Sequence, residues 1–256
     1  MNTQILNYKQ VGIGDHVILI HGLFGSMENL NMVAKGLVDK YCVTSIDVRN
    51  HGSSFHENNM EYPQLAADVI AVMDTLNIES AHVLGHSMGG KIAMELALTY
   101  SQRVNKLMIA DIAPIKYPAH HQQIINGLKS IDFSQVHSRK DADNQLSNYV
   151  DDASVRPFLL RNLATTNGHY HFKCALEFID NCYDQIMSGY LGNNQFLGDT
   201  LFIKGGNSDY ITSAHRARIN ELFPNVSAKI IQGAGHWLHA EKTTAFNKIV
   251  NDFLDQ

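Results

Sequence analysis

The stretch HVLGHSMGGKIAM, residues 82–94, decides the fold. It begins with a short apolar run that is typical of a buried strand, and it leads into an amphipathic pattern that predicts a helix to about Thr99. Between the two, GHSMG at residues 85–89 matches the Gly-x-Ser-x-Gly turn that holds a nucleophilic serine in a strained conformation. An ordinary Gly-rich turn has the same pattern, but the strand before it and the helix after it favour Ser87 as a nucleophile.

Short apolar runs alternate with helical patterns along most of the chain. The strand-like runs are residues 17–20, 42–46, 82–84, 106–110, 201–203 and 228–231. Helix-spaced apolar residues occur at about residues 26–39, 62–77, 212–222 and 243–253. This alternation predicts an α/β fold in which a parallel sheet carries helices on both faces.

The alternation is interrupted between about residues 113 and 197, where helix-like stretches dominate and no comparable strand run occurs. These stretches are residues 124–128, 145–150, 155–163 and 176–187. We therefore expect a core formed by residues 1–112 and 198–256, with residues 113–197 as a helical cap inserted over one end of the sheet. A chain of 256 residues is consistent with one large domain that carries an insertion.

Composition argues against several classes of protein. The chain has 20 Lys and Arg against 25 Asp and Glu, a net charge of −5 with no basic cluster, so no nucleic-acid partner is expected. Its apolar runs are strand-sized and its first residues do not resemble a secretory signal, so no membrane partner is expected either. Cys42, Cys174 and Cys182 form no Cys-x-x-Cys pair, which indicates reduced thiols and a cytoplasmic location.

A serine nucleophile needs a base, and His236 is the best placed of the 14 histidines. It lies in GAGHW, residues 233–237, after the last predicted strand and before the last predicted helix. In a parallel sheet this loop lies at the same edge as the loop of Ser87. The order of serine before histidine is also the order expected for this architecture.

Two aspartates are candidates for the acid that orients the histidine. Asp111 ends the predicted strand at residues 106–110, and Asp209 follows the strand at residues 201–203. Either carboxylate could accept the Nδ1–H of His236 and stabilise the imidazolium. The pattern of residues alone does not separate the two.

The segment HGLFG, residues 21–25, follows the first central strand and should lie beside Ser87. We expect the backbone N–H groups of Leu23 and Met88 to form an oxyanion hole, which would stabilise a tetrahedral intermediate. The residues expected to contact a substrate around it are His21, Gly22, Phe24 and Trp237.

No metal site or cofactor is expected. Two pairs of histidines, His120 with His121 and His169 with His171, have some resemblance to metal ligands. No Cys or carboxylate accompanies them at a recognisable spacing.

Four ordered motifs, spread over nearly the whole chain, together resemble the α/β-hydrolase superfamily. They are HG at residues 21–22, DVRNHGSS at 47–54, GHSMGGK at 85–91 and GAGHW at 233–237. The sequence is most similar to the YbfF-like esterases. The segments that carry this closer resemblance are HGLFGS at 21–26, RNHG at 49–52, DIAP at 111–114, GGNS at 205–208 and HWLHA at 236–240.

The resemblance implies an eight-stranded, mostly parallel sheet with a helical cap. It also implies hydrolysis of carboxylic esters or thioesters of short-to-medium acyl groups without a cofactor. In that subfamily the acid is the aspartate of the Asp-Ile-Ala-Pro segment, which is Asp111 here. The wider superfamily uses the position that is Asp209 here, so Asp111 is preferred and Asp209 is its rival.

Several other activities known for this fold are alternatives to ester hydrolysis. Haloalkane dehalogenases and epoxide hydrolases need a carboxylate at the position of Ser87, which argues against both. An acyl-CoA thioesterase and a C–C bond hydrolase would use the same triad. A non-catalytic ligand-binding protein is the alternative from a different class, and a serine-reactive fluorophosphonate would not label it.

Overall fold

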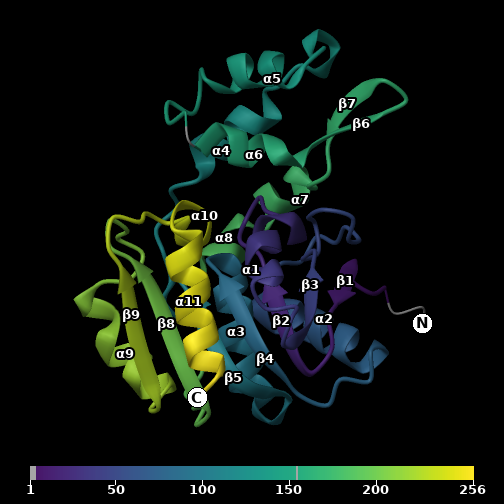
Figure 1. Ribbon diagram of the computed structural model, residues 1–256. Helices are drawn as coiled ribbons and strands as arrows, with labels where there is room; N and C mark the ends of the chain where they lie inside the picture. The colour runs from purple at the N-terminus through teal and green to yellow at the C-terminus, as the bar shows by residue number, and fades with distance from the viewer. Residues whose placement is uncertain (1–3, 154) are drawn as a thin grey trace.

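The structure is a computed structural model that describes residues 4–153 and 155–256. Its main element is a seven-stranded sheet with the strand order β1-β3-β2-β4-β5-β8-β9 (Figure 1). The first pair, β1 and β3, is antiparallel, and the other neighbours are parallel. The strands are β1 (Tyr8–Val11), β2 (Asp15–Ile20), β3 (Tyr41–Ile46), β4 (Ala81–His86), β5 (Val104–Ala110), β8 (Asp199–Gly205) and β9 (Val226–Ile231).

Helices cover both faces of this sheet. Successive strand residues point to opposite sides, so the apolar residues of one strand are shared between two layers of helices. On β2, Ile18 and Ile20 belong to the apolar cluster on the side of α2, α3 and α9. Val17 and Leu19 belong to the cluster on the side of α1, α10 and α11. These helices are α1 (Asn31–Lys35), α2 (Tyr62–Thr75), α3 (Met88–Thr99), α9 (Arg216–Leu222), α10 (Leu238–Glu241) and α11 (Thr243–Leu254).

The chain between β5 and β8 forms a separate group of elements, most of which lies beyond one end of the sheet (Figure 1). The carboxyl ends of the parallel strands lie at that end. The elements are α4 (Gln122–Lys129), α5 (Arg139–Leu146), α6 (Val155–Leu159), β6 (Leu163–Thr166), β7 (His169–Phe172), α7 (Leu176–Asn181) and α8 (Tyr183–Met187).

The hairpin of β6 and β7 corrects the expectation of a wholly helical insertion. Its strands pair antiparallel across Asn167 and Gly168, whose φ angles of 52° and 81° are those of a two-residue hairpin turn. The strands are four residues long, half-exposed and mostly polar, so no apolar run marks them. The Asn-Gly pair is the sequence signal that could have predicted them.

The main sheet also has seven strands within the described residues, where the resemblance implied eight. All six strand-like runs of the sequence lie in strands, so those predictions are confirmed. Strand β1 was not predicted, because it is an edge strand with three exposed residues and no apolar run.

No helix among the described residues has the length and apolar character needed to cross a bilayer.

Candidate active site

Ser87 lies on the tight turn between β4 and α3, as the sequence predicts. Its φ of 54° and ψ of −121° place a non-glycine residue in a strained region of the backbone. The turn is packed closely against β2, since a Cβ added to Gly89 would lie 2.2 Å from the carbonyl oxygen of Ile20. Glycine is therefore required at position 89 for α3 to begin this close to the sheet.

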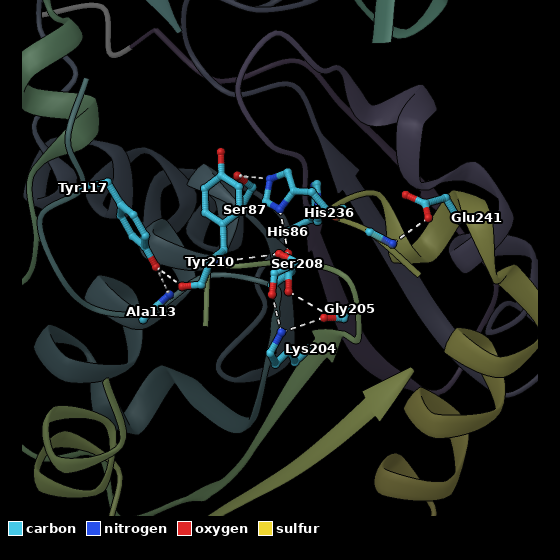
Figure 2. Close-up of polar contacts among 12 residues, drawn as sticks. His86, Ser87, Ala113, Tyr117, Lys204, Gly205, Ser208, Tyr210, His236 and Glu241 are labelled. Carbon is cyan, nitrogen blue, oxygen red and sulfur yellow. Dashed lines mark hydrogen bonds and ion pairs between the residues drawn. The ribbon is translucent and has the colours of Figure 1, made fainter. Parts of the chain in front are cut away.

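His236 lies in the loop that follows β9, and its ring connects Ser87 to Asp111. Figure 2 shows the ring beside Ser87. Nε2 is 2.9 Å from the Oγ of Ser87, and Nδ1 is 2.8 Å from Oδ2 of Asp111. A carboxylate only accepts hydrogen bonds, so Nδ1 carries the proton and Nε2 is left to accept the hydroxyl proton of Ser87. The structure therefore brings together the three side chains predicted to act as nucleophile, base and acid, from three separate loops.

Asp111 is fully buried just after β5, with a φ of 54° that turns it out of the strand direction. Its Oδ1 accepts the N–H of Gly205 at 3.0 Å, and its Oδ2 accepts the hydroxyl of Ser208 as well as Nδ1–H of His236. Three donors hold this carboxylate in place. Asp209, the rival acid, is exposed and makes no hydrogen bond to His236 within residues 4–153 and 155–256.

The two amides expected to form an oxyanion hole, those of Leu23 and Met88, donate to no other group among the described residues. Both residues line a cavity together with Ser87. The neighbouring amides of the loop are already used, because Phe24 N–H donates to His51 and Gly25 N–H donates to the carbonyl of Gly22. Two free amides beside a nucleophile can bind a developing oxyanion.

Two cavities meet at the nucleophile. The inner one is the smaller and is lined by Tyr62, Lys91 and Tyr117 among others. The outer one is larger and lies under the segment between β5 and β8. Residues lining both cavities are Leu23, Ser87, His121 and Tyr210.

The residues expected to contact the substrate divide into two groups. Gly22, Phe24 and Trp237 line the outer cavity, where Trp237 packs against Phe158 with ring centroids 5.4 Å apart. His21 differs from the expectation: it is fully buried and lines neither of the two cavities at Ser87. Its Nδ1–H donates to Gly22 O at 2.8 Å and its Nε2 accepts the N–H of Val48, so its ring supports the loop instead.

Tyr210 is a site residue that sequence reasoning missed. Its ring stacks on the imidazole of His236 with centroids 3.9 Å apart (Figure 2). Its hydroxyl lies 2.7 Å from Nε2 of His120, on the segment before α4. The neighbouring His121 lines both cavities, and burial lowers the pKa of its ring to about 3, so it is neutral. This pair of histidines therefore belongs to the wall of the site.

Lys91 is a second residue that sequence reasoning did not single out. Its ammonium is buried in the wall of the inner cavity and donates to the carbonyls of Met187 and Ser188 at 3.3 and 2.5 Å. It also lies over the rings of Tyr62 and Tyr117. Burial lowers the pKa of this ammonium to about 7. A buried amine with a lowered pKa therefore forms part of the wall of the inner cavity.

Among the described residues, no three His, Cys, Asp or Glu side chains are grouped so that they could hold a metal ion. His169 and His171 lie on β7, where both are exposed.

Comparisons with known proteins agree with this geometry. A family model described as alpha/beta hydrolase fold matches residues 15–135. Esterase YbfF of Escherichia coli is 34% identical to this chain, over 93% of this chain and 92% of the esterase. The sn-1-specific diacylglycerol lipase ABHD11 of Mus musculus is 36% identical, over 93% of this chain and 80% of the lipase. A solved marine microorganism esterase is 39% identical, with a TM-score of 0.95 over 98% of this chain and all of its own.

The parallel sheet and the serine turn after β4 are those of an α/β hydrolase. The chain belongs to the α/β-hydrolase superfamily and, within it, to the YbfF-like esterases. It is a carboxylesterase-type hydrolase that acts on small-molecule esters.

Proposed function

We propose that the chain cleaves carboxylic esters and thioesters of short-to-medium acyl groups through an acyl-enzyme on Ser87. The single observation that supports this most strongly is the pair of contacts at His236, 2.9 Å to Ser87 and 2.8 Å to Asp111. These are the contacts that a serine nucleophile, a base and an orienting acid need.

In the first half-reaction, Ser87 Oγ attacks the acyl carbonyl while its proton passes to Nε2 of His236. Asp111 stabilises the imidazolium that forms. The N–H groups of Leu23 and Met88 donate to the oxyanion of the tetrahedral intermediate. The intermediate collapses when the C–O or C–S bond breaks, and the proton on Nε2 goes to the departing alcohol or thiol.

In the second half-reaction, water attacks the acyl-enzyme and gives a proton to Nε2 of His236. A second tetrahedral intermediate forms in the same oxyanion hole. Its collapse releases the carboxylic acid and returns the proton to Ser87 Oγ, so the enzyme is restored.

The two cavities support a division of the substrate. We assign the acyl chain to the inner cavity, because its wall is mostly apolar and it is the smaller of the two. The leaving group then occupies the larger outer cavity, beside Phe158 and Trp237. Residues 113–197 act in this proposal as a cap over a core of residues 1–112 and 198–256.

The three free cysteines, of which Cys174 and Cys182 are buried, support a reducing and therefore cytoplasmic location. Relatives named sn-1-specific diacylglycerol lipases make a diacylglycerol one of the substrates to assay.

The test is hydrolysis of p-nitrophenyl esters from acetate to decanoate, of acyl-CoA and of a diacylglycerol, by wild type and Ser87→Ala. We expect turnover by wild type, a preference for the shorter chains, and loss of activity and of fluorophosphonate labelling in Ser87→Ala. Acyl-CoA turnover that exceeds ester turnover would identify a thioesterase. A wild type that neither turns over these substrates nor reacts with the fluorophosphonate would favour a ligand-binding protein.

A further inference from the structure

Phe24 adopts an unusual conformation in the loop that carries the Leu23 amide. Its φ of 57° lies in the left-handed region of the backbone, which residues other than glycine rarely adopt. Strain of this kind persists only where surrounding contacts hold it, and it concentrates at functional sites. The contacts that hold Phe24 come from two residues far away in the sequence, His51 and Asn162.

His51 holds the amide of Phe24 from the side of the core. Its Nε2 accepts the N–H of Phe24 at 3.1 Å, while its Nδ1–H donates to the carbonyl of Arg49 at 2.9 Å. The ring is fully buried, and burial lowers its pKa to about 3. Nε2 is therefore unprotonated and available as an acceptor throughout the neutral range.

Asn162 holds the carbonyl of the same residue from the segment above the sheet. It ends the 3-10 turn Leu160–Asn162 between α6 and β6 and is only 3% exposed. Its Nδ2 donates to the carbonyl oxygen of Phe24 at 2.5 Å and to that of Leu159 at 3.2 Å. A buried amide from this segment thus contacts the loop beside the nucleophile.

These contacts act on the direction of the Leu23 amide. The Gly22 carbonyl belongs to the same peptide group as the Leu23 N–H, and it is held by Nδ1–H of His21 at 2.8 Å and by the N–H of Gly25 at 2.9 Å. Because peptide groups are planar, this carbonyl sets the plane of the Leu23 N–H, while His51 and Asn162 hold the next two peptide groups against a rotation that would turn this plane. An oxyanion donor displaced by a fraction of an ångström loses much of its effect.

We infer that His51 and Asn162 are positioning residues for the oxyanion hole, which makes the segment between β5 and β8 a part of the device that stabilises the transition state. The inference rests on the proposed roles of Ser87 and the Leu23 amide. It predicts that loss of either side chain affects the transition state more than the bound substrate, although neither residue touches the reacting atoms.

The experiment compares wild type with Asn162→Ala and His51→Leu on p-nitrophenyl butyrate. We expect kcat to fall roughly 10- to 100-fold with KM changed less than about threefold, because a displaced donor costs less than the 10²- to 10³-fold of a deleted one. Affinity for a trifluoromethyl ketone, which forms a tetrahedral adduct on the serine, should fall by the same factor as kcat/KM. His51→Gln, which keeps an acceptor for the Phe24 amide, should recover part of kcat.

Asn225→Ala is the matched control, since it removes an asparagine-to-carbonyl hydrogen bond of 2.6 Å to Leu197, away from the site. It should keep wild-type kcat and wild-type affinity for the ketone. Where Asn162→Ala does not fold, Asn162→Asp at pH 8 keeps the size of the side chain, removes the donor and provides the same test.

Unchanged kcat/KM and ketone affinity in folded Asn162 and His51 variants would overturn the inference. A loss of kcat/KM that disappears once activity is divided by the fraction of active sites that a fluorophosphonate labels would also overturn it. Such a loss would mean only that the variants contain less folded enzyme, which is the pattern of a merely structural role. Failure of the proposed function is a different result, in which wild type itself shows no activity that depends on Ser87.

Discussion

The ring of Tyr210 lies flat against the imidazole of His236, with an angle of 17° between the two planes and 3.9 Å between their centroids. Tyr210 is itself fixed at both ends. Its carbonyl accepts the hydroxyl of Tyr117, and its own hydroxyl lies 2.7 Å from Nε2 of His120. The plane of the proposed base is therefore set by an aromatic neighbour as well as by the carboxylate of Asp111.

Removing the ring of Tyr210 should reduce turnover. Aromatic contacts are worth about 0.5–1.5 kcal/mol beyond the area they bury, so we expect Tyr210→Leu to lower kcat about tenfold. Tyr210→Phe keeps the stacked ring and loses only the hydroxyl, and its kcat should stay within about threefold of wild type. Steady-state kinetics of both variants on one p-nitrophenyl ester give the measurement. Equal losses in the two variants would contradict a role for the ring.

The two candidate acids should respond differently to the same substitution. Asp111→Asn removes the carboxylate that fixes the tautomer of His236, and changes of this kind lower kcat by about 10⁴. Asp209→Asn alters an exposed side chain and should leave kcat within about twofold. The measurement is kcat for both variants, with circular dichroism to check that each is folded. A large loss in Asp209→Asn with a near-normal Asp111→Asn would reverse the assignment of the acid.

The turn that carries Ser87 should be intolerant of any added Cβ at Gly89. An alanine there would place its Cβ 2.2 Å from the carbonyl of Ile20, so β2 and α3 would have to separate. We expect Gly89→Ala to lower kcat at least 100-fold and the free energy of unfolding by about 1–3 kcal/mol, as overpacking does. Gly168→Ala is the control for backbone strain without a clash, because its Cβ would meet no atom within 4 Å although its φ of 81° disfavours alanine. It should lower the free energy of unfolding but keep kcat, since the hairpin turn lies away from Ser87. Equal activity in the two variants would mean that the turn relaxes more easily than its packing indicates.

Much of the site could be predicted from sequence because a parallel sheet brings the loops after its strands to one edge. Ser87, His236 and both candidate acids all follow predicted strands, and local pattern is enough to find them. The choice between Asp111 and Asp209 depends instead on side-chain direction. Asp111 turns inward at a φ of 54° to meet three donors, while Asp209 remains exposed, and no local pattern encodes that difference.

The supporting residues could not be predicted, because their contacts join parts of the chain that only tertiary packing brings together. Asn162 lies 138 positions from Phe24, and His120 lies 90 positions from Tyr210. The buried ammonium of Lys91 is hidden for the same reason, since its acceptors lie at the end of α8. The sequence therefore predicts the candidate reacting groups, whereas the groups that hold them emerge only from the packing.

Lys91 should make stability depend on pH. Its ammonium has a pKa of about 7 in the folded protein, lowered by burial from about 10.5. Between these values the unfolded chain binds more protons than the folded one, so the free energy of unfolding rises with pH, by up to about 1.4 kcal/mol per pH unit. Below pH 7 both states carry the charge, and the cost of burying it is constant.

Lys91→Met should remove this dependence, because a thioether neither titrates nor carries a charge into the pocket. Relative to wild type, the variant should be most stable below pH 7 and should lose that advantage steadily as the pH approaches 10. Urea unfolding of both proteins at intervals from pH 6 to pH 9.5 measures the difference. Lys248→Met is the control: Lys248 pairs with Asp252 on the exposed face of α11, and its loss should shift stability by a small amount without the same slope. Parallel curves for wild type and Lys91→Met would mean that the ammonium stays protonated in the folded protein, held by the carbonyls of Met187 and Ser188 and by the two tyrosine rings.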